Sequence, residues 1–123
     1  MDYNYFQKRR KAFCYAWNGI IYLFRNEAHA KIHLFAAACV IAAGAIFGIS
    51  RWEWSSVLIC IGGVFMAESF NTAIEKISDK VSKERDPLIK IAKDVGAGAV
   101  LLFVLASVAV GLIVFLPYII ALF

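Results

Sequence analysis

The sequence predicts an all-α membrane protein with an N-terminal amphipathic surface helix and three transmembrane helices. Hydrophobic residues form 62% of its 123 residues and charged residues only 18%, with a mean hydropathy of +0.72. Soluble domains are only roughly half apolar. Three stretches, at about 32–49, 52–74 and 95–122, are long enough to cross roughly 30 Å of hydrocarbon. We expect one domain over residues 1–123 and no cleaved signal, since residues 1–31 lack an uninterrupted apolar core.

The N-terminal segment, about 5–28, is predicted to be an amphipathic helix. Bulky apolar residues recur at helical spacing, while basic and polar residues occupy the other sides. The apolar set is Phe6, Phe13, Trp17, Ile20, Ile21 and Phe24. Because a spanning segment follows directly, we expect this helix to lie in the membrane interface. The alternative, packing only on a protein core, has little soluble core available in so short a chain.

The three spans differ from the segments that join them. Each span contains small residues, which let helix backbones approach closely in lipid. Trp52 and Trp54 beside Arg51 are typical of an interfacial anchor. Six basic residues precede the first span, six lie between the second and third, and only Arg51 lies between the first and second. The positive-inside rule therefore places the N-terminus and the loop at about 76–93 in the cytoplasm, and the C-terminus outside.

The basic patches are expected to face anionic lipid headgroups or phosphate, with no nucleic-acid partner. Cys14, Cys39 and Cys60 are odd in number and far apart, so we expect buried small side chains rather than disulfides or metal ligands. His29 and His33 have the i, i+4 spacing of a zinc pair. No third ligand is evident, and an interfacial or hydrogen-bonded histidine is the favoured interpretation.

An acidic stripe on the second span is the strongest functional signal. Glu68, Asn71, Glu75 and Asp79 fall on one face of a helix over roughly 16 Å of its axis. A carboxylate on a spanning helix costs a few kcal/mol unless it is paired, protonated, hydrated or metal-bound, which indicates a functional site in the bundle interior. A purely structural polar seam is one alternative. An ion-conducting subunit is another, although the outer halves of the spans are nearly free of charge.

Further polar residues gather on the expected cytoplasmic side: Glu27, Glu84, Arg85, Asp86, Lys93 and Asp94. Carboxylates and amides suit Mg²⁺, and lysines suit the phosphates of a nucleotide. Glu68 lies deepest, where a lipid hydroxyl can reach it, whereas Glu75 and Asp79 lie nearer water. The pattern predicts phosphoryl transfer across the membrane boundary.

Two motifs resemble those of a known family. Residues 68–75 resemble the signature E-x-x-N-[ST]-A-I-E of the small bacterial membrane kinases that comprise diacylglycerol kinase and undecaprenol kinase, and residues 92–100 resemble their second block. The resemblance runs from about Phe13 to Pro117. It implies a homotrimer of three-span subunits in the bacterial inner membrane, with active sites shared between neighbours. The implied reaction moves the γ-phosphate of ATP, with Mg²⁺, to a lipid hydroxyl.

The resemblance also implies roles for individual residues. Glu68 matches the catalytic base, Asn71 a catalytic polar residue, and Glu27 and Glu75 the metal-binding acids, with Asp79 in support. The matches to nucleotide-contacting positions are Tyr15, Glu84, Arg85, Asp86, Lys93 and Asp94, together with Lys8, which replaces an arginine. His33 replaces a glutamate of diacylglycerol-using members. With the sequence Asp86-Pro87-Leu88, this favours undecaprenol as substrate; the alternatives are diacylglycerol kinase and a non-catalytic membrane subunit.

Overall fold

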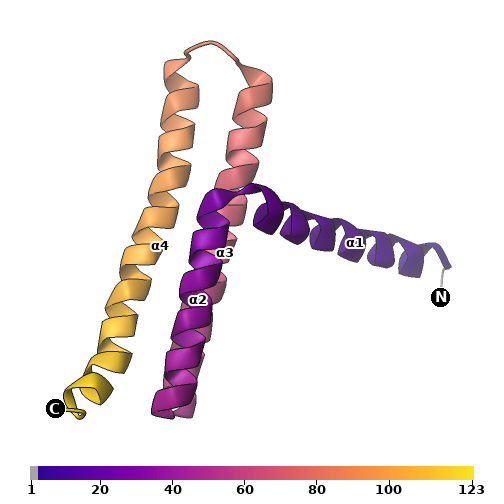
Figure 1. Ribbon diagram of the computed structural model, residues 1–123. Helices are drawn as coiled ribbons and strands as arrows, with labels where there is room; N and C mark the ends of the chain where they lie inside the picture. The colour runs from indigo at the N-terminus through magenta and orange to yellow at the C-terminus, as the bar shows by residue number, and fades with distance from the viewer. Residues whose placement is uncertain (1–2) are drawn as a thin grey trace.

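The computed structural model describes residues 3–123 as four helices: α1 (Tyr3–Asn26), α2 (Ala28–Phe47), α3 (Arg51–Val81) and α4 (Pro87–Ile120). The last three run alongside one another, and α1 projects sideways from the start of α2 (Figure 1). Within the described residues, α2, α3 and α4 are the helices long and apolar enough to cross a membrane. The expected all-α architecture of one surface helix and three spans is confirmed, and the chain is a multi-pass membrane protein.

Two boundaries differ from the sequence prediction. The first helix ends at Asn26 and α2 begins at Ala28, so Glu27, which has extended backbone angles (φ −102°, ψ 116°), separates them. The loop expected at 76–93 narrows to residues 82–86, because α3 and α4 continue beyond their apolar parts. Hydropathy marks the hydrocarbon layer, whereas helical hydrogen bonding continues into the polar flanks.

Local sequence signals define the connections between helices. Gly48 ends α2 with φ +63°, a left-handed conformation that glycine adopts without strain. Ser50 and Glu53 then form a reciprocal capping box at the start of α3. Asp86 caps α4 by accepting from the backbone N–H groups of Leu88 and Ile89, and Pro87 occupies the first helical turn, where no N–H is required.

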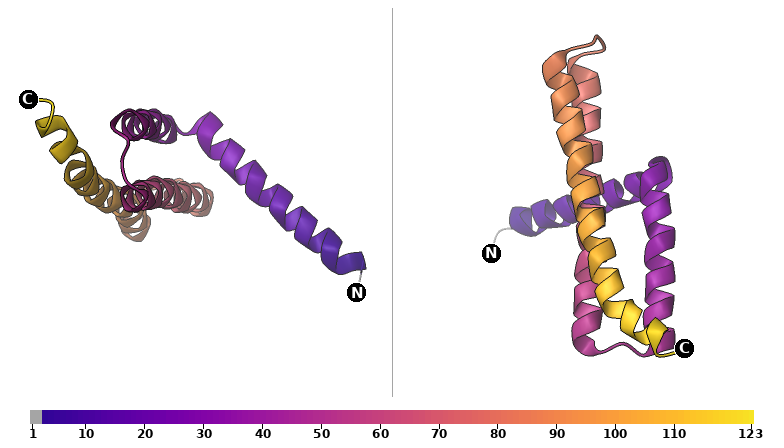
Figure 2. Two further views of the ribbon diagram at one scale, coloured as in Figure 1. Left: turned by 90° about the horizontal axis from the view of Figure 1, so that it is seen from below. Right: turned by 90° about the vertical axis from the view of Figure 1, so that its left-hand side faces the viewer.

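Helices α3 and α4 pack against each other more extensively than any other pair of helices. They form a hairpin, and its turn lies beyond the point where α1 joins α2 (Figures 1 and 2). Gly63 of α3 lies against the ring of Phe103 of α4, and an added Cβ would lie 2.1 Å from Phe103 Cζ. At the opposite end, Glu53 Oε1 accepts a 2.6 Å hydrogen bond from the hydroxyl of Tyr118. A small residue and a polar link therefore contribute to the close approach of the two helices.

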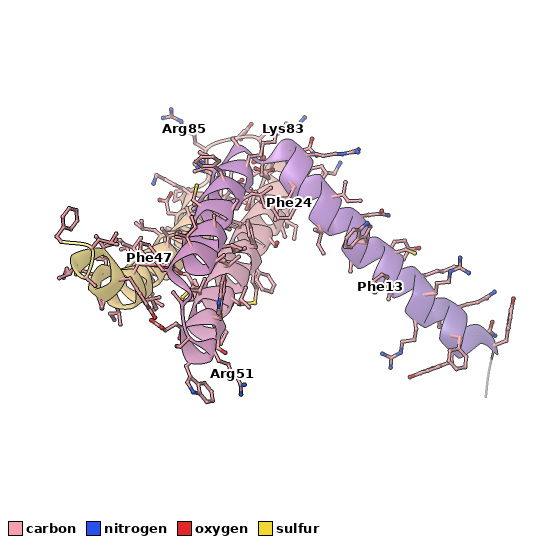
Figure 3. All side chains as sticks on the ribbon, turned by 60° about the horizontal axis from the view of Figure 1, so that its bottom comes forward. Phe13, Phe24, Phe47, Arg51, Lys83 and Arg85 are labelled. Atoms are coloured by element: carbon pink, nitrogen blue, oxygen red, sulfur yellow. The ribbon has the colours of Figure 1, made fainter. Side chains whose placement is uncertain are left out.

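The first helix contacts the bundle only near its C-terminal end. Leu23 is buried, and the ring of Phe24 packs on Phe65 of α3 at a centroid distance of 5.0 Å. Phe13, midway along the projecting helix (Figure 3), and Trp17 are exposed within the single chain. An uncovered apolar side on this helix agrees with a position in the membrane interface.

Burial corrects the expectation for the cysteines. All three are free, but Cys14 and Cys39 are exposed and Cys60 is only half-buried. The reason is that Cys14 lies on the projecting α1 and Cys39 lies on a side of α2 that no other helix of the chain covers. Small apolar side chains on such surfaces are stable against lipid as well as in a protein core.

Candidate active site

Glu68 is the deepest member of the acidic stripe. It lies on α3 and is 4% exposed, which makes it the one buried charged residue among residues 3–123. Its Oε1 atom lies 3.1 Å from Nε2 of His33 on α2. The helical period turns this side chain towards the interior, and the histidine provides a polar partner there. An unpaired carboxylate in the same place would be costly.

Asn71 and Glu75 occupy the next two turns of α3 on the same face. The side-chain amide of Asn71 donates to Glu75 Oε1 over 3.5 Å. The Oδ1 atom of Asn71 is buried without a hydrogen-bond partner in the described chain, and it faces the Cα of Gly96 on α4, where an added Cβ would lie 2.7 Å away. A buried acceptor of this kind is available to a bound ligand.

Two buried hydroxyl residues on α3 extend this face: Thr72, at 7% exposure, and Ser78, at 5%. Neither residue is among the predicted site residues, because that prediction rests on ionisable and amide side chains. Their spacing was a usable signal, since Thr72 follows Glu68 by four residues and Ser78 follows Glu75 by three. The polar face is therefore broader than the predicted stripe.

Asp79 connects the end of the stripe to α4. Its Oδ1 accepts a 2.7 Å hydrogen bond from Lys93 Nζ. Both residues lie on polar helical extensions, outside the apolar parts of the spans. The hydrogen bond from Lys93 lowers the pKa of the Asp79 carboxyl below its usual value. The same bond raises the pKa of Lys93, so both groups remain charged at neutral pH and hold the hairpin together near its turn.

A charged hollow of about 480 Å³ lies at the hairpin turn. Most of the predicted nucleotide-contacting residues line it: Glu84, Arg85, Asp86, Lys93 and Asp94, together with Asp79. Figure 3 shows the side chains of Lys83 and Arg85 at the tip of this hairpin. We call this site, defined by those residues, the hairpin hollow. The carboxylate of Asp86 also has the capping role described above.

An apolar hollow of about 220 Å³ lies at the other end of the stripe. It is lined by residues of α2, α3 and α4, among them Ala37, Val64 and Phe65, and His33 is its one basic lining residue. Thus the stripe starts beside an apolar space in the spanning part of the molecule and ends at the charged hairpin hollow.

Glu27 lies at the break between α1 and α2. Its Oε1 atom is 4.0 Å from Lys76 Nζ, and the same ammonium group lies over the ring of Tyr22. Across residues 3–123, no three His, Cys, Asp or Glu side chains come together in a way that could hold a metal ion. Among these residues no third carboxylate, thiol or imidazole therefore joins Glu27 and Glu75 in a metal-holding group, and no third ligand lies with His29 and His33.

Within the single chain, Lys8 and Tyr15 do not lie near the polar face of α3 or the hairpin hollow. Both are exposed on α1, which points away from the three spans (Figure 2). Of the predicted site residues, the structure thus groups Glu68, Asn71 and Glu75 along α3, and Asp79 with Lys93 and the hairpin hollow. Glu27 lies apart near Lys76, and the two α1 residues lie furthest from the rest.

Comparison with known proteins identifies the family of the chain. Residues 14–115 match the family described as prokaryotic diacylglycerol kinase. The undecaprenol kinase of Bacillus subtilis is 40% identical over 107 residues, which are 87% of each chain. A diacylglycerol kinase of Synechocystis is 36% identical over 107 residues, covering 86% of this chain and 61% of the relative. One from Pseudomonas aeruginosa is 33% identical over 85 residues, 69% of each chain. With a match that covers most of its length, the chain belongs to the prokaryotic diacylglycerol kinase family of membrane lipid kinases.

Proposed function

We propose that this protein transfers the γ-phosphate of ATP to the hydroxyl of a membrane lipid alcohol, and that the alcohol is undecaprenol. The observation that carries the proposal is the buried carboxylate of Glu68 on a polar face that connects an apolar hollow with a charged one. The apolar hollow suits the hydrocarbon chain of a lipid alcohol, and the charged hollow suits the phosphates of a nucleotide. The similarity to an undecaprenol kinase over 87% of the chain supports the choice of alcohol.

In this reaction Glu68 accepts the proton of the lipid hydroxyl as the hydroxyl oxygen attacks the γ-phosphorus. The bond between the γ-phosphorus and the oxygen that bridges it to the β-phosphate breaks, and ADP leaves. Asn71, one turn further along α3, orients the reacting groups. Lys93 offsets the negative charge on the phosphoryl oxygens, and Asp79 positions its ammonium group through their hydrogen bond. Phosphoryl transfer depends mainly on such positioning and electrostatic stabilisation. The remaining hairpin residues (Glu84, Arg85, Asp86 and Asp94) are assigned to nucleotide binding.

The donor atoms on the polar face fit Mg²⁺. Carboxylate and amide oxygens are the protein ligands this ion prefers, and the buried Oδ1 of Asn71 has no partner in the described chain. We assign Glu27 and Glu75 as the residues that hold the ion. When bound, Mg²⁺ neutralises charge on the phosphates of ATP.

We further propose that the protein works as a homotrimer in the bacterial inner membrane, with the N-terminus and the hairpin in the cytoplasm. The uneven distribution of basic residues supports this orientation. Shared sites account for Lys8 and Tyr15, which are exposed on α1, the helix that projects away from the three spans (Figure 1). In the trimer they would contribute to the nucleotide site of a neighbour.

Mixing two inactive variants tests the shared site. Glu68 and Glu75 lie about 10 Å apart along one helix, so one chain need not bring both to the same substrate. If Glu68 and Glu75 act from different subunits, an equal mixture of Glu68→Gln and Glu75→Gln chains forms some sites with both native residues. Random assembly of trimers then gives about a quarter of the native turnover. Turnover no higher than that of either variant alone would mean that Glu68 and Glu75 act from one chain.

A competition assay tests the substrate. Purified protein in mixed micelles with Mg-ATP receives undecaprenol and diacylglycerol at equal mole fractions, and the phosphorylated lipids are separated and counted. We expect undecaprenol to have the higher kcat/KM. Preference for diacylglycerol would overturn the assignment of substrate but leave the lipid kinase, and transfer to neither lipid would contradict the proposed reaction.

A further inference from the structure

We propose that His33 is a positioning residue for the catalytic base: it holds the carboxylate of Glu68 in its reactive orientation from the neighbouring helix. This inference rests on the proposed role of Glu68 as the base. It adds a residue on α2 to a site whose other central members, Glu68, Asn71 and Glu75, all lie on α3. It also assigns a function to His33, which is half-buried, whereas His29 of the same pair is exposed.

The first argument is the environment of the carboxylate. The side chain of Glu68 is 6% exposed and that of His33 is 23% exposed, with 3.1 Å between Nε2 and Oε1. Within residues 3–123, no other basic side chain forms an ion pair with Glu68. With little access to water, the orientation of this carboxylate depends on the imidazole. Without that partner the carboxylate would be free to rotate away from the lipid hydroxyl, which would weaken it as a base.

The second argument is the position of the imidazole. His33 also lines the apolar hollow, beside Ala36, Ala37 and Phe65. The imidazole therefore has its Nε2 atom at the carboxylate of Glu68 and also borders an apolar space, which suits its amphipathic character. A leucine at this position would fill the hollow but leave Glu68 without a partner. A glutamine would reach the same place as Nε2 with an amide that can donate a hydrogen bond.

The third argument is distance from the nucleotide residues. His33 is absent from the lining of the hairpin hollow, which holds Lys93 and its neighbours. A residue that acts only through Glu68 should change the rate of the chemical step and leave the apparent affinity for ATP unaltered. This separation of kcat from KM distinguishes positioning from a general disturbance of the fold.

The experiment compares His33→Leu, His33→Gln and His33→Asn in the purified full-length protein. We expect His33→Leu to lower kcat by about 10–100-fold with KM for ATP changed less than about twofold, because small displacements of reacting groups have effects of that size. His33→Gln should retain activity within about threefold of native. His33→Asn, which has the same amide on a shorter side chain, should resemble the leucine variant.

His29 provides the matched control. It lies one turn earlier on α2 and is exposed, so His29→Leu should leave kcat and KM unchanged. If His33 served only to pack the apolar hollow, leucine would retain activity and glutamine would lose it. That order of activities, or three active variants, would overturn the proposal. Retained helical content by circular dichroism confirms that the variants fold.

A combined variant separates this inference from the proposed role of Glu68. If His33 acts through the carboxylate, adding His33→Leu to Glu68→Gln should lower the residual activity no further, because the two changes remove one function. If the double variant instead loses activity by the product of the two single losses, the inference about His33 is overturned, while the role of Glu68 stands. Full activity of Glu68→Gln alone would instead overturn the proposed base, and the reason for a positioning histidine with it.

Discussion

Replacing Glu68 with glutamine should lower kcat by about 10²–10⁴-fold, the usual contribution of a general base. Glutamine has nearly the same shape as glutamate but cannot accept the proton of the lipid hydroxyl. It can still contact His33 with its amide, so the packing between α2 and α3 should persist. The measurement is transfer of labelled phosphate from the γ position of ATP to extracted lipid, under saturating concentrations of both substrates.

The same substitution elsewhere on α3 provides a control. Glu53 lies at the opposite end of the helix, where its carboxylate accepts hydrogen bonds from Tyr118 and from the backbone N–H of Ser50. A glutamine side-chain oxygen can accept both bonds, so Glu53→Gln should retain native turnover. Near-native activity of Glu68→Gln would contradict a catalytic base at this position and would favour a structural role for the acidic stripe.

The polar face of α3 could be predicted from sequence because it depends on the geometry of a single helix. Glu68, Asn71 and Glu75 share a face whenever their segment is helical, whatever lies around it. The contact between Glu68 and His33 could not be predicted in this way. It depends on the relative rotation and height of α2 and α3, and spacing within one helix does not fix either.

The same distinction explains the boundaries and the hairpin. Mean hydropathy located the three spans but not the ends of the helices, because α3 and α4 extend beyond their apolar parts. The extensions bring Asp79 and Lys93, separated by 14 positions in the sequence, to 2.7 Å. A flexible loop over residues 76–93 would not hold Asp79 and Lys93 in fixed positions. Two helices joined by residues 82–86 place the two side chains opposite each other.

The residues of α1 show the limit of single-chain reasoning. Their amphipathic pattern predicted a surface helix, and the structure has one. Yet Lys8 and Tyr15 acquired functional roles only through the family resemblance, and the single chain leaves both exposed. No pattern within the sequence states which surface of another subunit they would meet. Their proposed roles therefore depend on contacts between subunits of the trimer.

Gly96→Ala should lower kcat by about 10–100-fold while leaving the protein as stable as the native form. An added Cβ at Gly96 would lie 2.7 Å from Oδ1 of Asn71, which is too close for both atoms to remain in place. Because Oδ1 is the end of a rotatable side chain, the fold can relieve this overlap by turning Asn71. The substitution therefore affects catalysis rather than stability, because a small displacement of a catalytic group lowers the rate steeply.

The stability measurement makes this prediction specific. Within a helix, alanine is favoured over glycine by about 1 kcal/mol, so thermal unfolding of Gly96→Ala should occur at the native temperature or above it. Gly98, on the same helix, has no neighbouring atom within 4 Å of an added Cβ, and Gly98→Ala should gain the same helix propensity without losing activity.

A further substitution identifies the cause of the loss. If Gly96→Ala acts by displacing Asn71, then Asn71→Ala should reduce activity in the native background but not in the Gly96→Ala background. Independent losses would show that the new methyl group disturbs some other part of the site. Native kcat in Gly96→Ala would mean that the orientation of Asn71 seen here is not required for catalysis, because the carbonyl oxygen of that side chain cannot stay where it is beside a methyl group.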